Sequence, residues 1–136
     1  MIFRSKAPLR LGLAGGGTDV SPYCDLFGGA ILNATINMYA HASIQLGIGN
    51  SIVIQAIDKD ITESYPPVDY IEPQGKLDLH AGVYNRMVKD FGLKPVPMVI
   101  TTYVDAPIGS GLGTSSTLVV ASLGAFAELL HLPLGE

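Results

Sequence analysis

The sequence has 136 residues and a formal net charge of −4. Hydrophobic residues make up 48% of the chain, which is enough to bury a core, and the low charged fraction of 15% argues against disorder. No cluster of Lys and Arg is present, which excludes the usual electrostatic signature of nucleic-acid binding and disfavours an anionic membrane surface. The composition predicts one domain over residues 1–136 that binds neither nucleic acid nor membrane.

The cysteine content and the start of the chain favour a cytoplasmic protein. Cys24 is the only cysteine, so no disulfide forms within the chain. Arg10 interrupts the apolar stretch near the amino terminus, which is atypical of a signal peptide. The longest apolar run, residues 118–126, is too short for a membrane span.

In chain order, the first half is predicted to be mostly strand. Pro8 is expected to break the first strand, and Gly15-Gly16-Gly17 forces a turn. Thr18 or Asp19 is predicted to cap a short helix over residues 20–27. Strands are predicted where apolar and β-branched residues prevail, over residues 2–7, 9–14, 30–37, 39–48 and 51–57.

The second half is predicted to add one strand and two helices. Residues 58–76 are polar and proline-containing, which indicates a loop with at most one short strand. A helix capped by Asp78 is expected over residues 78–91, since apolar residues recur every four positions along it. These are Leu79, Val83, Met87 and Phe91. A strand over 97–104, a loop over 105–113 and a helix over 114–131 complete an α+β fold, with the sheet on one side and the helices on the other.

The loop between the last strand and the last helix carries the strongest motif. It reads Pro107-Ile108-Gly109-Ser110-Gly111-Leu112-Gly113-Thr114-Ser115-Ser116. Alternate glycines let backbone N–H groups turn inward, and the helix amino terminus adds further N–H groups and a positive dipole end, so the motif suits a polyphosphate. The missing lysine excludes a Walker A loop, and the glycine spacing excludes the dinucleotide fingerprint. A plain glycine-rich turn with a Thr or Ser cap is the alternative interpretation.

The motif resembles the phosphate-binding loop of the GHMP kinases, the family of galactokinase, homoserine kinase, mevalonate kinase and phosphomevalonate kinase. Thr114 and Ser116 depart mildly from the usual Gly-Leu-Gly-Ser-Ser-Ala ending. The resemblance implies the family's amino-terminal domain, similar to ribosomal protein S5, with ATP and Mg²⁺ as cofactors. It implies that Pro107, Gly109, Ser110, Gly111, Leu112, Gly113, Thr114, Ser115 and Ser116 bind ATP, and that Ser115 lies beside the magnesium.

A second segment, residues 6–19, resembles the family's first motif. Ala7, Pro8, Arg10, Gly15, Thr18 and Asp19 carry the match. The resemblance implies that Arg10 is catalytic and that Thr18 and Asp19 bind the sugar. Chemistry supports Arg10 independently, because a fixed guanidinium stabilises the charge that develops in phosphoryl transfer.

Gly16 and Gly17 stand where galactokinase carries a Glu-His pair, so the side chains that would contact galactose are absent. This version resembles the sugar-kinase branch with D-glycero-D-manno-heptose 7-phosphate kinase and the fucokinase domain. The implied substrates are ATP and a sugar or sugar phosphate, and a homodimer is possible. Fucokinase, a galactokinase-like enzyme and a catalytically dead nucleotide-binding fragment remain alternatives.

The resemblance also implies that the chain is incomplete. Members of the family are about twice this length or more, and their third motif and general base lie beyond the second motif. We therefore expect the 136-residue chain to be inactive alone.

Overall fold

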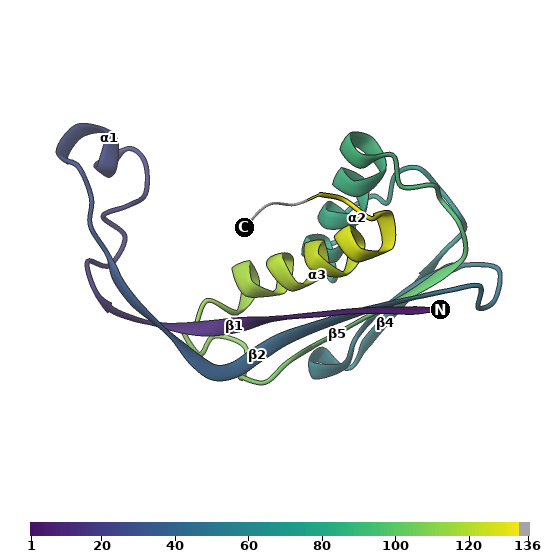
Figure 1. The fold of residues 1–136 in the computed structure, drawn as a ribbon, viewed down its shortest axis with the longest axis horizontal. Helices are drawn as coiled ribbons and strands as arrows, with labels where there is room; N and C mark the ends of the chain where they lie inside the picture. The colour runs from purple at the N-terminus through teal and green to yellow at the C-terminus, as the bar shows by residue number, and fades with distance from the viewer. Residues whose placement is uncertain (134–136) are drawn as a thin grey trace.

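The computed structural model describes residues 1–133 as one five-stranded sheet with two helices on a single face (Figure 1). The strand order is β1-β2-β5-β3-β4, with β3 and β5 parallel and the other neighbours antiparallel. This arrangement confirms the predicted α+β fold with helices on one side. The strands are β1 (Ile2–Ala14), β2 (Leu32–Leu46), β3 (Ile52–Ala56), β4 (Ile61–Tyr65) and β5 (Met98–Val104).

The helix layer consists of α2 (Asp78–Phe91) and α3 (Thr114–Leu130). Both agree with the predicted ranges to within one residue. The predicted cap of α2 is wrong, because Leu77 occupies the cap position. The Asp78 carboxylate instead accepts a hydrogen bond from the Gly75 N–H at 2.8 Å, which fixes the turn before the helix.

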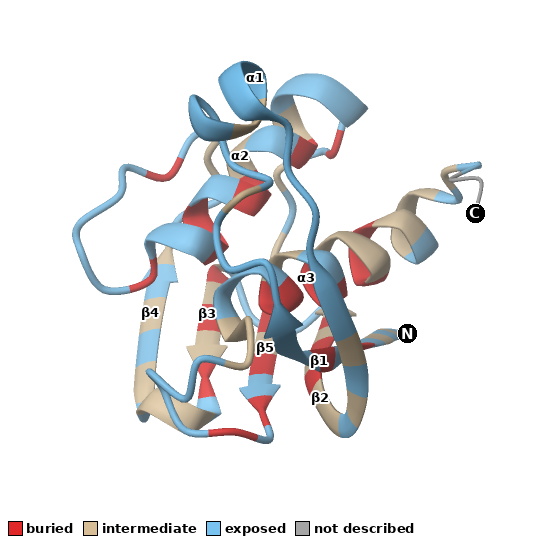
Figure 2. Ribbon diagram, turned by 90° about the vertical axis from the view of Figure 1, so that its left-hand side faces the viewer, coloured by how far each residue is buried: buried red, intermediate tan, exposed pale blue. Residues whose placement is uncertain are grey.

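Alternation along the central strands places the core between the sheet and the helices. Ile52, Ile54 and Ala56 of β3 are buried, and the residues between them are half-buried. On β5, Met98, Ile100, Thr102 and Val104 are buried in the same way. Figure 2 shows this red stripe on the inner strands, as the period of two in a strand requires.

Two predicted strand breaks are wrong. Residues 30–37 and 39–48 were predicted as separate strands, but β2 runs unbroken from Leu32 to Leu46, because both parts of it pair with β1. Pro8 does not end β1 either; the pairing with β2 shifts register between Pro8 and Arg10 and continues. β1 is an edge strand, where the missing N–H of a proline is tolerated.

The ends of β1 and β2 that are joined by α1 (Tyr23–Phe27) extend beyond the helix layer as an arm, residues 11–32 (Figure 1). The predicted helix over residues 20–27 shrinks to these five residues, which follow Pro22. Neither Thr18 nor Asp19 caps it. The Thr18 hydroxyl instead binds Ala30 across the arm, donating to its carbonyl at 3.1 Å and accepting from its N–H at 3.3 Å.

Candidate active site

The glycine-rich loop joins β5 to α3 and takes a left-handed backbone at alternate residues. Gly109, Gly111 and Gly113 have φ values of 80°, 73° and 73°, a region that side chains disfavour. The Ser110 N–H donates to the Pro107 carbonyl at 3.2 Å, which closes the first turn of the loop. The alternate glycines of the motif are therefore required by the shape of the loop.

Three backbone N–H groups at the start of α3 have no acceptor within the helix. Gly113 is the cap residue and has no side chain to fill that role, and the first helical bond is that of the Thr117 N–H with the Gly113 carbonyl at 3.0 Å. The N–H groups of Thr114, Ser115 and Ser116 therefore precede the helical ladder. Ser115 and Ser116 are exposed, so this helix end is accessible to an anion.

Arg10 lies against this helix end. The Arg10 N–H donates to the Leu112 carbonyl at 3.1 Å, which ties β1 to the loop. A Cβ placed on Gly113 would lie 3.2 Å from both Cζ and a terminal nitrogen of the Arg10 guanidinium. The fold thus brings together a cation and a row of free N–H groups from opposite ends of the chain.

Asp105 anchors the start of the loop to β2. Its carboxylate accepts a hydrogen bond from the Tyr39 N–H at 2.7 Å and lies 3.3 Å from His41 Nε2. The Asp105 N–H donates to the Tyr39 carbonyl at 2.9 Å. This role went unpredicted, since it depends on a cross-strand neighbour, although a carboxylate directly after a strand was visible in the sequence.

The proposed sugar residues lie on the arm. Thr18 is engaged with Ala30, so its hydroxyl holds the two sides of the arm together. Asp19 is exposed. The contacts of the described residues thus connect Arg10 with the loop, but they do not connect Thr18 or Asp19 with either.

The glycines of the arm serve two different purposes. A Cβ on Gly15 would lie 2.1 Å from the Ala30 carbonyl oxygen, and one on Gly29 would lie 1.9 Å from that of Thr18. A Cβ on Gly16 or Gly17 would meet nothing within 4 Å. Gly15 and Gly29 therefore allow close backbone contact, whereas Gly16 and Gly17 border open space.

A shallow cleft adjoins the loop on the side of α2. Asp58 and Lys59 of the short turn after β3 line it together with Leu79 and Ile108. Thr114 and Ser115 at the start of α3 form its other wall. The cleft combines apolar side chains with one charge of each sign, Asp58 and Lys59. Sequence analysis did not predict it because its lining comes from four separated segments.

His80 lies outside the site. It is buried at 5% exposure, and its Nε2 is 2.8 Å from the Thr102 hydroxyl. Burial, and secondarily the charge of Lys59, lowers the pKa of His80 to about 4. The imidazole is therefore neutral at pH 7 and belongs to the core.

Within residues 1–133, no group of three or more His, Cys, Asp or Glu side chains is placed to hold a metal ion. The oxygen donors at the loop are the hydroxyls of Thr114, Ser115 and Ser116, which suit a hard cation such as Mg²⁺. These hydroxyls fit a magnesium ion that is held mainly by phosphate oxygens. Over the same residues, no helix is long and apolar enough to cross a bilayer.

The fold and the site define an α+β domain with a glycine-rich loop at the amino end of α3. The family model described as "GHMP kinases N terminal domain" matches residues 78–136. A heptose phosphate kinase structure from Bacteroides thetaiotaomicron, described as a D-glycero-D-manno-heptose 1-phosphate kinase, superposes with a TM-score of 0.91 at 56% identity, over 99% of this chain and 44% of that one. Residues 78–136 thus match the amino-terminal domain of the GHMP kinases, and nearly the whole chain is similar to heptose phosphate kinases.

Two further relatives define how far the likeness extends. The D-glycero-alpha-D-manno-heptose 7-phosphate kinase of Campylobacter jejuni is 49% identical over 98% of this chain and 39% of its own length. The mevalonate kinase of Methanococcus jannaschii shares the fold, with a TM-score of 0.80 at 16% identity, over 99% of this chain and 42% of that one. The chain spans about two fifths of the length of these relatives.

Proposed function

We propose that the chain is the ATP-phosphate-binding part of a sugar kinase whose acceptor is a D-glycero-D-manno-heptose phosphate. The observation that carries the proposal is the Arg10 guanidinium beside Gly113, at the amino end of α3. An arginine beside a helix end with free N–H groups provides the positive charge and the donors that a transferring phosphoryl group requires. The acceptor is inferred from the relatives of known name, at 49% and 56% identity.

In this proposal the loop binds the phosphates of ATP. The N–H groups of Thr114, Ser115 and Ser116 donate to phosphate oxygens, and the dipole of α3 favours their negative charge. Pro107, Gly109, Ser110, Gly111, Leu112 and Gly113 shape the loop around them. The nucleoside end of ATP lies in the cleft beside the loop, where Leu79 and Ile108 contribute apolar surface and Lys59 a charge.

Arg10 stabilises the transferring group. Negative charge spreads over the equatorial oxygens as the γ-phosphoryl group leaves ATP, and a guanidinium donates two parallel hydrogen bonds to such oxygens. The Arg10 N–H bond to Leu112 fixes the backbone of this residue relative to the loop. When bound, Mg²⁺ neutralises phosphate charge, and Ser115 is the hydroxyl we assign beside it.

The sugar lies on the arm side of Arg10. Asp19 is exposed and accepts hydrogen bonds from sugar hydroxyls, while Thr18 keeps the arm closed through Ala30. The open space beside Gly16 and Gly17 leaves room for a sugar larger than a hexose. The anomeric hydroxyl is the proposed acceptor, and the remaining length of the full protein supplies the base that removes its proton.

A substrate panel with the full-length protein tests this function. The panel contains the heptose 7-phosphate, L-fucose, galactose and mevalonate, with ATP consumption and product mass measured for each. L-Fucose is included because the L-fucokinase/L-fucose-1-P guanylyltransferase of Bacteroides fragilis is a 29% identical relative. We expect the heptose phosphate to have the highest kcat/KM by at least ~100-fold. ATP binding without turnover of any sugar would instead favour a nucleotide-binding protein that has lost catalysis.

A further inference from the structure

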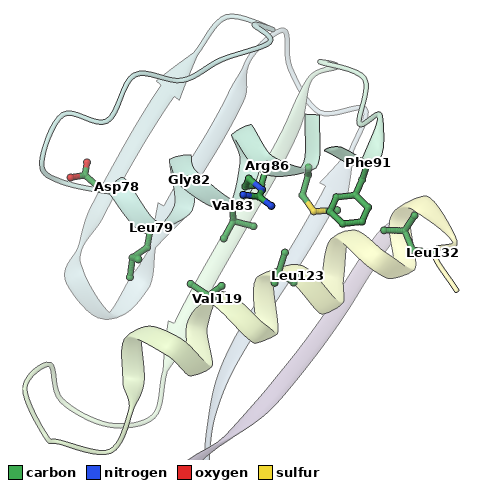
Figure 3. Close-up of a pocket in the computed structure, with 10 residues that line it drawn as sticks. Asp78, Leu79, Gly82, Val83, Arg86, Phe91, Val119, Leu123 and Leu132 are labelled. Atoms are coloured by element: carbon green, nitrogen blue, oxygen red, sulfur yellow. The ribbon is translucent and has the colours of Figure 1, made fainter. Parts of the chain in front are cut away.

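Helix α2 faces α3 on one side and the sheet on the other. Between α2 and α3 lies an apolar groove of about 610 Å³ (Figure 3). The apolar side chains that line it include Leu79, Val83, Phe91, Val119 and Leu123. Leu79 points toward α3 in Figure 3 and borders both this groove and the cleft beside the glycine-rich loop. Because successive residues of a helix are about 100° apart, the next side chain, that of His80, turns to the sheet.

His80 is the first link of a hydrogen-bond chain inside the core. His80 and Thr102 of β5 are buried at 5% and 1% exposure, and His80 Nε2 lies 2.8 Å from Thr102 Oγ1. The Thr102 hydroxyl also donates to the Gln55 carbonyl of β3 at 3.4 Å. A hydroxyl has a single proton, so all three groups are satisfied when Nε2–H donates to Thr102 and Thr102 donates to Gln55. These bonds connect α2, β5 and β3.

The last link of this chain lies at the base of the cleft. Gln55 stands just before the short turn Ile57–Lys59, which follows β3. From this turn Asp58 and Lys59 line the cleft, and Leu79 lines it from α2. The bonds of His80 thus tie the helix that bears one part of the cleft to the strand that bears another.

Packing alone does not explain a histidine at position 80. In the neutral ring Nε2 carries the proton and Nδ1 is a bare acceptor, which is buried and has no hydrogen-bond partner within residues 1–133. A buried polar atom without a partner costs about 1–3 kcal/mol. Leucine would fill a similar volume without this cost, and Thr102 would keep the Gln55 carbonyl as its acceptor. What the histidine adds is the bond from Nε2 to Thr102.

We propose that His80 is a positioning residue for the cleft, because its bond to Thr102 fixes the turn after β3 relative to Leu79. The inference rests on the proposed function, in which this cleft holds the nucleoside end of ATP. His80 is buried and contacts no ligand itself. The glycine-rich loop is held by separate bonds to β1 and β2. Loss of the His80 bond should therefore weaken binding of the nucleoside and leave binding of the phosphates intact.

Binding of ATP and of inorganic tripolyphosphate to the full-length protein tests this role, since tripolyphosphate has phosphates but no nucleoside. We expect His80→Leu and Thr102→Val to raise Kd for ATP at least ~5-fold and to leave Kd for tripolyphosphate within ~2-fold. The side-chain NH₂ group of His80→Gln replaces Nε2–H, so this variant should keep both Kd values within ~2-fold of the original. Ser122→Ala removes a buried hydroxyl from α3 and is the matched control, which should change neither Kd.

Three results would overturn the proposal. Unchanged ATP binding in His80→Leu and Thr102→Val would show that the bond does not shape the cleft. Equal weakening of ATP and tripolyphosphate, or a His80→Gln protein as weak as His80→Leu, would indicate a general loosening of the core. An original protein that bound neither ligand would contradict the proposed function, and this inference with it. Either of the two variants that break the bond suffices if the other does not fold.

Discussion

At the scale of single residues, the arm contains glycines of two different kinds. Gly29 is required because the Thr18 carbonyl oxygen occupies the place of its Cβ, at 1.9 Å. Gly17 has no neighbour within 4 Å of that place and no positive φ, so its backbone accepts any residue. The fold therefore does not require glycine at position 17, and under the proposed function the missing side chain leaves room for the sugar.

This difference predicts opposite effects of two substitutions in the full-length protein. Gly17→Leu fills the space proposed for the sugar, so KM for the heptose phosphate should rise at least ~10-fold. KM for ATP should stay unchanged, and the free energy of unfolding should change by less than ~0.5 kcal/mol. Gly29→Ala forces the arm apart and should lower the melting temperature. An unchanged KM for the sugar in Gly17→Leu would place the acceptor elsewhere.

His80 makes the stability of the domain depend on pH. Its pKa is lowered to about 4 in the folded chain from 6.5, first by burial, so the unfolded chain binds a proton that the folded chain excludes between these values. The contribution of His80 to the free energy of unfolding is therefore fully present above pH 6.5, and it is lost as the pH falls toward 4.

We expect the free energy of unfolding to fall by about 2 kcal/mol between roughly pH 7.5 and pH 5 because of His80 alone. His80→Gln keeps a polar partner for Thr102 but does not titrate, so it should lose this part of the pH dependence. Urea unfolding at both pH values measures the difference. If the free energy of unfolding of the original chain and of His80→Gln changed in parallel with pH, His80 would not be the cause of the pH dependence.

At the scale of elements, α2, α3, β3 and β5 were predicted closely because local signals agree with their surroundings. Gly92 ends α2, alternation marks β3, and glycines mark the loop before α3. The continuity of β2 and the shortening of α1 were not predictable, since both depend on pairing across the arm. The candidate site divides in the same way. The motifs pointed to the loop and to Arg10, which the fold brings together, whereas the contacts of Asp105 and the cleft at Lys59 depend on tertiary structure.

The contact between Arg10 and the end of α3 predicts a difference between two glycines of the loop. Gly111 and Gly113 share a φ of 73°, so alanine strains the backbone alike at both, by ~1–2 kcal/mol. Only at Gly113 does the new Cβ also meet the Arg10 guanidinium, at 3.2 Å. Gly113→Ala should therefore reduce kcat of the full-length protein at least ~10-fold more than Gly111→Ala. Equal losses of kcat in the two variants would contradict a role for Arg10 in the reaction.

At the scale of the whole molecule, two apolar surfaces remain open. One is the groove between α2 and α3, and the other is the arm, where Leu13, Leu26 and Phe27 are 59%, 72% and 74% exposed. Exposed apolar surface of this extent usually meets another part of a protein. The chain also spans only about two fifths of the length of these relatives.

We therefore expect the 136-residue chain to bind ATP without phosphorylating a sugar, and to associate with itself as its concentration rises. Turnover assays and light scattering over a concentration series measure these two properties. Turnover at an ordinary kinase rate would contradict the expected incompleteness of the site, and a clean monomer would contradict the self-association.

The most direct test of the central claim is calorimetric titration of ATP into the chain and two arginine variants. Arg10 contacts the loop at Gly113, whereas Arg4 is an exposed residue near the start of the same strand. The account predicts that Arg10→Ala weakens ATP binding at least ~10-fold, that Arg4→Ala leaves it unchanged, and that adenosine binds the original chain far more weakly than ATP. Equal affinities of the three proteins for ATP, or equal binding of adenosine and ATP, would contradict a phosphate site formed by Arg10 and the glycine loop.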